Sequence, residues 1–271
     1  MKIEKVGHIP TLDEYLTQNI ENNNPKIKEI VDDFCDFPGP EKKDCQNEKE
    51  NSLREKRALL LKSFKNRVDD IIIFNRYALH QYNINAENIG PKFALYDEEY
   101  GGMFSSILDK QDEEKIEYAR LGFKNFDWVC ELLNARKIAD EGLIIHLWAT
   151  IEQHVKRAIL IMEESRKEMP YKWNELKRLS KEVGIDLESL PSYDIINEIR
   201  VVNNKIKHLY IVDKELCKYT GFAEHEGKKM SAVNYRTHEY ALAAHHFMNR
   251  LVMAMGPVIS YAPDRIIDEN E

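Results

Sequence analysis

A short stretch near the end of the chain holds three side chains suited to handling a phosphate. Arg200, Asn204 and His208 recur at a spacing of four residues, which places them a turn apart on one face of a helix. Arginine binds phosphate through a planar fork of donors, and histidine exchanges protons near neutral pH. RNA can be cut without a metal ion when two groups transfer protons and a cation stabilises the phosphate. The pattern predicts His208 as general acid/base, Arg200 as the cation and Asn204 as the orienting amide.

The neighbouring polar residues extend this face. Asn203, Lys205 and Lys207 are predicted to contact the RNA backbone. The apolar residues of the same stretch form a heptad-like stripe on the other side of the helix, which needs a core to pack against. That stripe consists of Ile195, Ile199, Val202, Ile206 and Leu209.

A plainer interpretation of the same residues stays open. Charges and amides on a solvated helix face need no catalytic role, and a histidine in a last turn is favoured by the helix dipole. Geometry also constrains the catalytic interpretation, because the Cα atoms of Arg200 and His208 would lie roughly 12 Å apart along the axis. One helix alone therefore holds Arg200 and His208 too far apart to act on the same phosphate. We predict a two-fold dimer in which this helix faces its mate across a cleft.

Two segments resemble a known family. The run Asn203-Asn-Lys-Ile-Lys-His208, which follows an Ile-rich amphipathic helix, resembles the signature region of HEPN (higher eukaryotes and prokaryotes nucleotide-binding) domains. The stretch Leu147-Trp-Ala-Thr-Ile-Glu152-Gln-His-Val-Lys156 is similar to an early helix of such domains. The likeness covers about residues 112–256.

The resemblance implies an all-α bundle of four to five helices that dimerises. Many HEPN domains are metal-independent ribonucleases of toxin–antitoxin, phage-defence and RNA-processing systems, and others are noncatalytic. The implied function is therefore a metal-independent endoribonuclease, a toxin or antiphage component, with RNA as substrate and an antitoxin or other protein as partner. The alternative is a noncatalytic HEPN-like module that binds a nucleotide or a protein. Neither alternative requires a cofactor or a metal ion.

The sequence departs from the family motif at its arginine. The hallmark is an Arg followed after four to six residues by His, whereas seven residues separate Arg200 from His208. Asn203 stands where the Arg is common. Carried over strictly, only His208 and the adjacent polar residues match, and Arg200 is a displaced candidate. Asp194 and Glu198 lie upstream, where family members often have an acidic residue.

Composition limits the other function classes. The chain has 271 residues and a net charge of −8, so it is not a general polyanion binder. Eleven Gly and nine Pro are few for this length, which favours helices. No apolar run approaches a membrane span, and the first residues lack the apolar core of a signal peptide. Four widely spaced cysteines fit free thiols in a reducing cytoplasm, where we expect the protein.

The order of helical patterns predicts an all-α antiparallel bundle of HEPN type with an additional N-terminal helical region. Residues 1–110 are predicted as that region, with a capping box at Thr11–Glu14, a long amphipathic helix over 52–82 and a loop over 83–110. Residues 111–271 are predicted as the bundle. Its expected helices are 112–139, 143–165, 171–183 closed by Gly184, one opened by Pro191 with Ser192 as N-cap, and 237–255, with a loop or small hairpin over 213–235.

Other motifs are rejected on spacing. Gly221 and Gly227 are separated by five residues, and no Ser or Thr follows the lysine, so this is no phosphate-binding loop. His146 and His154 are too far apart on one helix to share a metal ion. A serine hydrolase of the nucleophile-elbow type needs a pattern such as GxSxG, which is lacking.

Overall fold

In the computed structural model, residues 7, 9–12, 14, 29–30, 48–100 and 113–258 are described. Within these ranges the chain forms five α-helices, and the prediction of an all-α fold is confirmed. None of the described helices combines the length and apolar character that crossing a bilayer requires. The helices are α3 (Glu48–Tyr100), α4 (Glu113–Met162), α5 (Trp173–Glu182), α6 (Tyr193–His208) and α7 (Thr237–Ala254).

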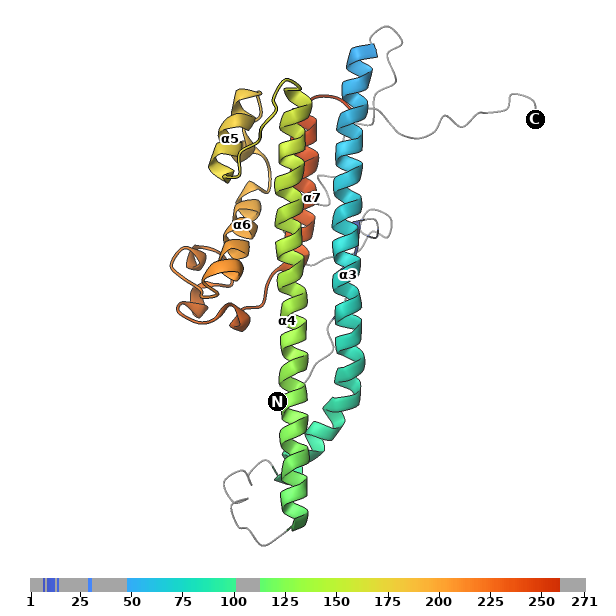
Figure 1. Ribbon diagram of the computed structural model, residues 1–271, viewed down its shortest axis with the longest axis vertical. Helices are drawn as coiled ribbons and strands as arrows, with labels where there is room; N and C mark the ends of the chain where they lie inside the picture. Colours follow the sequence, from blue (N-terminus) through green and yellow to red (C-terminus); the bar gives the residue numbers. More distant parts are fainter. Residues whose placement is uncertain are drawn as a thin grey trace, which may run out of the picture.

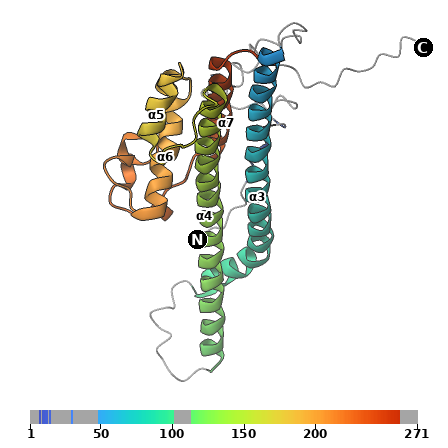
Figure 2. The same cartoon turned by 45° about the horizontal axis from the view of Figure 1, so that its top comes forward.

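Two long antiparallel helices form the spine of the molecule. Helices α3 and α4 have 53 and 50 residues, so each is about 75–80 Å long at 1.5 Å per residue. They run side by side, and α7 packs against both in one half of their length (Figures 1 and 2). Helices α5 and α6 lie on the other side of α4 in that same half. The remaining halves of α3 and α4 project beyond the bundle as a two-helix arm (Figure 1).

Helix α3 runs further than its sequence predicts. The predicted loop over 83–110 is wrong up to residue 100, because the helix continues through Gly90-Pro91 to Tyr100. A proline inside a helix removes one hydrogen bond and clashes with the preceding turn, which bends the helix without necessarily ending it. The helix bends toward α4 near its C-terminal end (Figure 1). Packing of α3 against α4 offsets the free-energy cost of having this glycine and proline inside the helix.

Helix α4 is also longer than predicted. The expected helices over 112–139 and 143–165 are a single element, with Gly142 inside it. A mid-helix glycine costs only about 1 kcal/mol relative to alanine. Buried Leu143 and Leu147 carry the apolar stripe on from this glycine into the core. Packing of that stripe therefore outweighs the local penalty.

All the long helices share one hydrophobic core. It contains Phe64 of α3, Ile151 of α4, Ile199 of α6 and Phe247 of α7, each fully buried. Helix α7 is buried on nearly every side, which explains why its sequence lacks a polar face. The shorter α5 is attached by an aromatic contact, because the rings of Trp148 and Trp173 meet edge to face at 4.9 Å.

Two predicted caps are confirmed. The Thr11 hydroxyl accepts from the Glu14 amide at 3.2 Å, and the Glu14 carboxylate accepts from the Thr11 amide at 2.7 Å, which is the reciprocal capping box. A hydrogen bond from Arg76 lowers the Glu14 pKa to about 2 and ties this segment to α3. Helix α5 ends as predicted at Gly184, whose φ of 92° closes the helix. The amides of Gly184 and Ile185 return to the carbonyls of Lys181 and Ser180.

The segment between α6 and α7 folds as short 3-10 turns around one antiparallel bridge, Ile211 to Lys229. The turns are η3 (Leu216–Lys218), η4 (Ala223–His225) and η5 (Met230–Ala232); a fourth, η2 (Leu187–Ser189), precedes α6. Two tyrosines attach the segment to α4, since the hydroxyls of Tyr210 and Tyr235 donate to buried Glu141 at 2.7 and 3.0 Å. Burial and this carboxylate raise the Tyr210 pKa to about 12.

Candidate functional site on helix α6

Helix α6 carries every residue of the predicted site. Its apolar stripe packs as expected at Ile195, Ile199 and Val202, which are buried. The stripe loosens toward the end of the helix, where Leu209 is 61% exposed. The opposite face is therefore turned away from the core, as the sequence predicts.

Ser192 stands at the predicted N-cap position, but for a different physical reason. Its side chain makes no capping hydrogen bond to the helix. The hydroxyl instead lies 2.8 Å from Nδ1 of buried His246 on α7. The backbone of Ser192 is left-handed, with φ 63°, a conformation that costs a non-glycine residue about 1–2 kcal/mol. The start of α6 is thus fixed to α7 by a side-chain contact.

Three of the predicted residues lie on the open face. Asn204 and His208 are exposed, and Arg200 is half-buried. At about 100° per residue, the four side chains of Asn197, Arg200, Asn204 and His208 fall within roughly 80° around the axis. Because α6 is helical from Tyr193 to His208, the predicted separation of Arg200 and His208 along the axis is retained. One chain presents the two groups on the same face, two turns apart.

Arg200 is held by a small polar cluster that the sequence did not reveal. Its Nε donates to Oδ1 of Asn197 at 3.0 Å, and Nδ2 of Asn197 donates to the Tyr219 hydroxyl at 2.9 Å. Among the described residues, the two terminal nitrogens of Arg200 have no hydrogen-bond partner. Burial raises the Tyr219 pKa, whereas the charge of nearby Arg200 opposes that rise. The guanidinium fork is therefore fixed in orientation while its ends stay available.

Asn197 could have been found from its spacing, because it precedes Arg200 by three residues and Asn204 by seven. Tyr219 gives no such signal. It follows the η3 turn, and its approach to α6 depends on how the whole segment folds back. We call the polar face of α6 formed by Asn197, Arg200, Asn204 and His208 the ridge; it starts upstream of the predicted site.

Asn203 lies apart from the others. Its side chain is 1% exposed, and its Nδ2 donates to Oδ1 of Asn204 at 3.3 Å. Its Oδ1 is buried and has no hydrogen-bond partner among the described residues. Unsatisfied buried acceptors are rare in native proteins, since each costs about 1–3 kcal/mol. At the position where the family motif has arginine, this chain therefore has an amide turned into the bundle.

The two lysines of the predicted site differ in their surroundings. Lys205 makes ion pairs with Asp213 at 2.6 Å and with Glu215 at 3.1 Å, and the hydrogen bond that Lys205 donates to Asp213 raises the Lys205 pKa. It holds the segment that follows α6. Lys207 is exposed in the last turn of the helix, beside His208. Of the two, Lys207 is the one placed to meet a substrate.

A buried ionic network fixes the inner face of α6. Glu198, 3% exposed, accepts a hydrogen bond from the Tyr240 hydroxyl at 2.6 Å and pairs with Arg236. Arg236 also contacts both carboxylate oxygens of Glu239 at 2.7 Å. Burial acts to lower the Arg236 pKa, but the Glu198 hydrogen bond and the two carboxylates raise it above its ordinary value. The acidic residue upstream of the motif thus binds an arginine of the protein itself.

The remaining histidines give no metal site in the described part of the chain, where no group of three or more His, Cys, Asp or Glu side chains is arranged to bind an ion. His154 is a buried residue between α3 and α4. A comparison of the sequence with family models, curated proteins and solved structures found no match. The proposed function therefore rests on the geometry of α6 and on the resemblance of its motif to that of HEPN domains.

Proposed function

We propose that this protein is an HEPN-like helical module that binds RNA through the ridge of α6 and cleaves it without a metal ion. The observation that carries the proposal is the state of Arg200, whose Nε is fixed by Asn197 while its terminal nitrogens lack a partner among the described residues. A guanidinium oriented in this way is suited to a phosphate oxygen pair. Exposed Asn204 and His208 continue the same face.

The chemistry follows from the positions of these groups. Arg200 binds the scissile phosphate and stabilises the charge that develops on it. His208 exchanges the proton of the 2′-hydroxyl or of the leaving oxygen, and exposed Lys207 contacts the backbone. Within one chain Arg200 and His208 lie roughly 12 Å apart. The catalytic pair is therefore formed between two copies, with the arginine of one helix facing the histidine of its mate.

The test of cleavage uses purified protein with total RNA in EDTA. We expect products with 2′,3′-cyclic phosphate ends, and we expect Arg200→Ala and His208→Ala to abolish them. Matched controls are Arg178→Ala on α5 and His80→Ala on α3, which remove an exposed arginine and an exposed histidine elsewhere. Equal cleavage by all four variants would assign the activity to a contaminant and end the proposal.

The shared site has its own test. When Arg200→Ala and His208→Ala chains are mixed and allowed to exchange, half of the dimers carry both variants, and each of these has one intact site. Activity should then return to about a quarter of the wild-type value. If each chain cleaves alone, mixing restores nothing.

A noncatalytic module is the second candidate, and one observation favours it. Asn203, at the arginine position of the family motif, is buried and cannot reach a substrate without leaving the core. In this case the ridge binds a nucleotide or RNA and leaves it intact. Binding that weakens with salt, is lost in Arg200→Ala and is accompanied by no cleavage identifies this function.

A further inference from the structure

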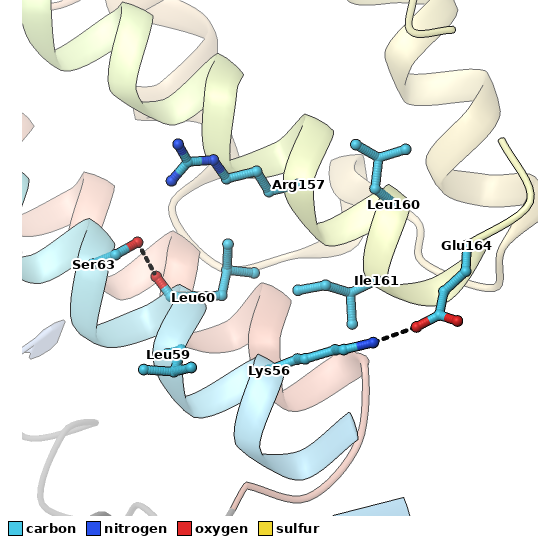
Figure 3. Close-up of a pocket in the computed structure, with 8 residues that line it drawn as sticks. All are labelled: Lys56, Leu59, Leu60, Ser63, Arg157, Leu160, Ile161 and Glu164. Carbon is cyan, nitrogen blue, oxygen red and sulfur yellow. Dashed lines mark hydrogen bonds and ion pairs between the residues drawn. The ribbon is translucent and has the colours of Figure 1, made fainter. Parts of the chain in front are cut away.

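A groove to which α6 contributes no residue has the properties of a small-ligand site. It lies between α3 and α4, has a volume of about 480 Å³, and falls in the range of pockets that bind small molecules. Its apolar lining comes from Leu59, Leu60, Leu160 and Ile161 (Figure 3). Leu59 is 49% exposed. The groove thus offers aliphatic surface to an apolar occupant.

The two ends of the groove differ in charge. At one end Lys56 of α3 pairs with Glu164, which follows α4, so these charges neutralise each other (Figure 3). Arg157 of α4 and Ser63 of α3 lie toward the other end (Figure 3). Arg157 is exposed and has no ion-pair partner among the described residues. An unpaired cation beside aliphatic surface favours an occupant that is apolar and carries, or develops, negative charge.

Ser63 is in contact with a histidine whose protonation can be derived from its neighbours. Oγ of Ser63 lies 3.0 Å from Nε2 of His154, and Nδ1 of His154 lies 2.8 Å from the Thr150 carbonyl oxygen. A carbonyl oxygen only accepts, so Nδ1 must carry the hydrogen. In the neutral ring Nε2 is then bare, and the Ser63 hydroxyl donates to it. The Leu60 carbonyl, at 3.2 Å, is the longer and competing acceptor for the same hydrogen.

The surroundings of the imidazole favour its neutral form and fix the ring in place. His154 is 3% exposed, and its burial lowers its pKa, to which the charge of Arg157 adds. The ring of Phe64 packs against it edge to face, with centroids 5.1 Å apart. A neutral imidazole with a bare Nε2 facing a hydroxyl is the arrangement in which a histidine acts as general base. A backbone carbonyl here orients the ring, a role that a carboxylate has in many hydrolases.

We propose that Ser63 and His154 are the nucleophile and the general base of a hydrolase site for aliphatic carboxylic esters, with the acyl chain bound in the groove. The Ser63 hydroxyl gives its proton to Nε2 of His154 while Oγ forms a bond to the ester carbonyl carbon. Arg157 stabilises the negative charge on the carbonyl oxygen. The carbon–oxygen bond to the alcohol then breaks, and the alcohol leaves with the proton from Nε2. Ser63 is left acylated.

Water completes the reaction. It gives a proton to Nε2 of His154 and adds to the acyl carbon, after which the bond to Oγ breaks and Ser63 regains its proton from Nε2. The net reaction is ester plus water giving a carboxylic acid and an alcohol. The site is separate from the ridge of α6 and does not depend on the function proposed for it.

The experiment uses the full-length chain and two probes. A fluorophosphonate reports the nucleophile, and p-nitrophenyl esters of acetate, butyrate and octanoate report turnover and chain length. We expect one adduct per chain on Ser63, located by peptide mass spectrometry, and faster release from butyrate and octanoate than from acetate. Ser63→Ala should abolish labelling, and His154→Gln should slow both reactions by about 10²–10⁴-fold.

The matched control is Ser192→Ala, which removes the second serine that contacts a histidine among the described residues. It should be labelled and should turn over esters as the wild type does. Circular dichroism shows whether each variant is folded, and Ser63→Ala, at an exposed helical position, is expected to be. Absence of labelling in the wild type, an adduct on another residue, or unchanged turnover in Ser63→Ala each overturns the proposal.

Discussion

Two serine–histidine contacts in this protein join the same residue types under opposite constraints. Ser63 lies in the middle of α3, and its hydroxyl donates a hydrogen bond to His154, whose ring is oriented by the Thr150 carbonyl. Ser192 precedes α6 in a left-handed conformation, and its hydroxyl contacts His246. The first contact borders a mostly aliphatic groove of about 480 Å³, and the second borders a smaller cavity of about 260 Å³ with acidic Glu29 and Asp194 in its lining. The first pair is arranged for chemistry and the second for holding two helices together.

The largest expected difference between the pairs is in reactivity. His154→Gln should lower the rate of ester turnover by about 10²–10⁴-fold, because the general base is lost. His246→Gln should leave that rate within about twofold of wild type, since α7's histidine does not line the groove. Initial rates with p-nitrophenyl butyrate measure both. Similar losses in the two variants would mean that the distinction between the pairs is wrong.

The second difference is in stability. Ser192→Ala should lower the free energy of unfolding by about 1–2 kcal/mol, because it removes the hydrogen bond between the Ser192 hydroxyl and the buried His246 ring while the backbone strain is unchanged. Ser63→Ala should lower it by less, about 0.5–1 kcal/mol, because alanine's higher helix propensity offsets part of the loss of the hydrogen bond to buried His154. Chemical denaturation of both variants gives the two values. A larger loss at position 63 would contradict the assignment of roles.

A smaller effect isolates the strain at Ser192. Glycine adopts positive φ at no steric cost, whereas alanine does not. Ser192→Gly should therefore have a free energy of unfolding about 0.5–1 kcal/mol higher than that of Ser192→Ala, measured by chemical denaturation. This order is the reverse of the usual one for the two residues. The usual order would show that the left-handed backbone at this position is not retained.

The smallest expected effect is in pH dependence. Burial lowers the His154 pKa below its ordinary value of 6.5, so the unfolded chain binds a proton more readily than the folded one. Stability is then fully present above about pH 6.5 and falls as the pH drops toward the folded pKa. His238, whose pKa burial also lowers, adds a term of the same sign. Denaturation at pH 7.5 and pH 5.5 should therefore show a smaller fall in His154→Gln than in the wild type.

Local signals in the sequence predicted local structure well. The capping box at Thr11–Glu14 and the closure of α5 at Gly184 are formed by residues close in the chain, so their patterns carry the needed information. The buried stripe of α6 follows for the same reason. In contrast, Gly142 and Pro91 are read as breaks from the sequence, although packing between α3 and α4 continues both helices. Tertiary contacts decided these two positions.

The candidate sites were predictable to different degrees. The open face of α6 follows from spacing along one helix, and Arg200, Asn204 and His208 lie there. The burial of Asn203 depends on how closely α6 packs against its neighbours, which spacing does not state. Ser63 and His154 are 91 residues apart in the chain, and only the register of α3 against α4 brings them together. Such a pair leaves no motif among neighbouring residues in the sequence, so a search for nucleophile elbows does not find it.

The two-helix arm has a consequence for how the molecule unfolds. Among the described residues, α3 and α4 pack only against each other beyond the bundle, and the small cluster of Tyr82, Ala86 and Leu132 is separate from the main core. A segment with so few apolar neighbours opens at lower free energy than the rest. Amide hydrogens near Tyr82 should exchange with solvent well before those near Phe64 or Ile151. The arm is thus able to melt and reform as its own unit while both the α6 ridge and the groove remain folded.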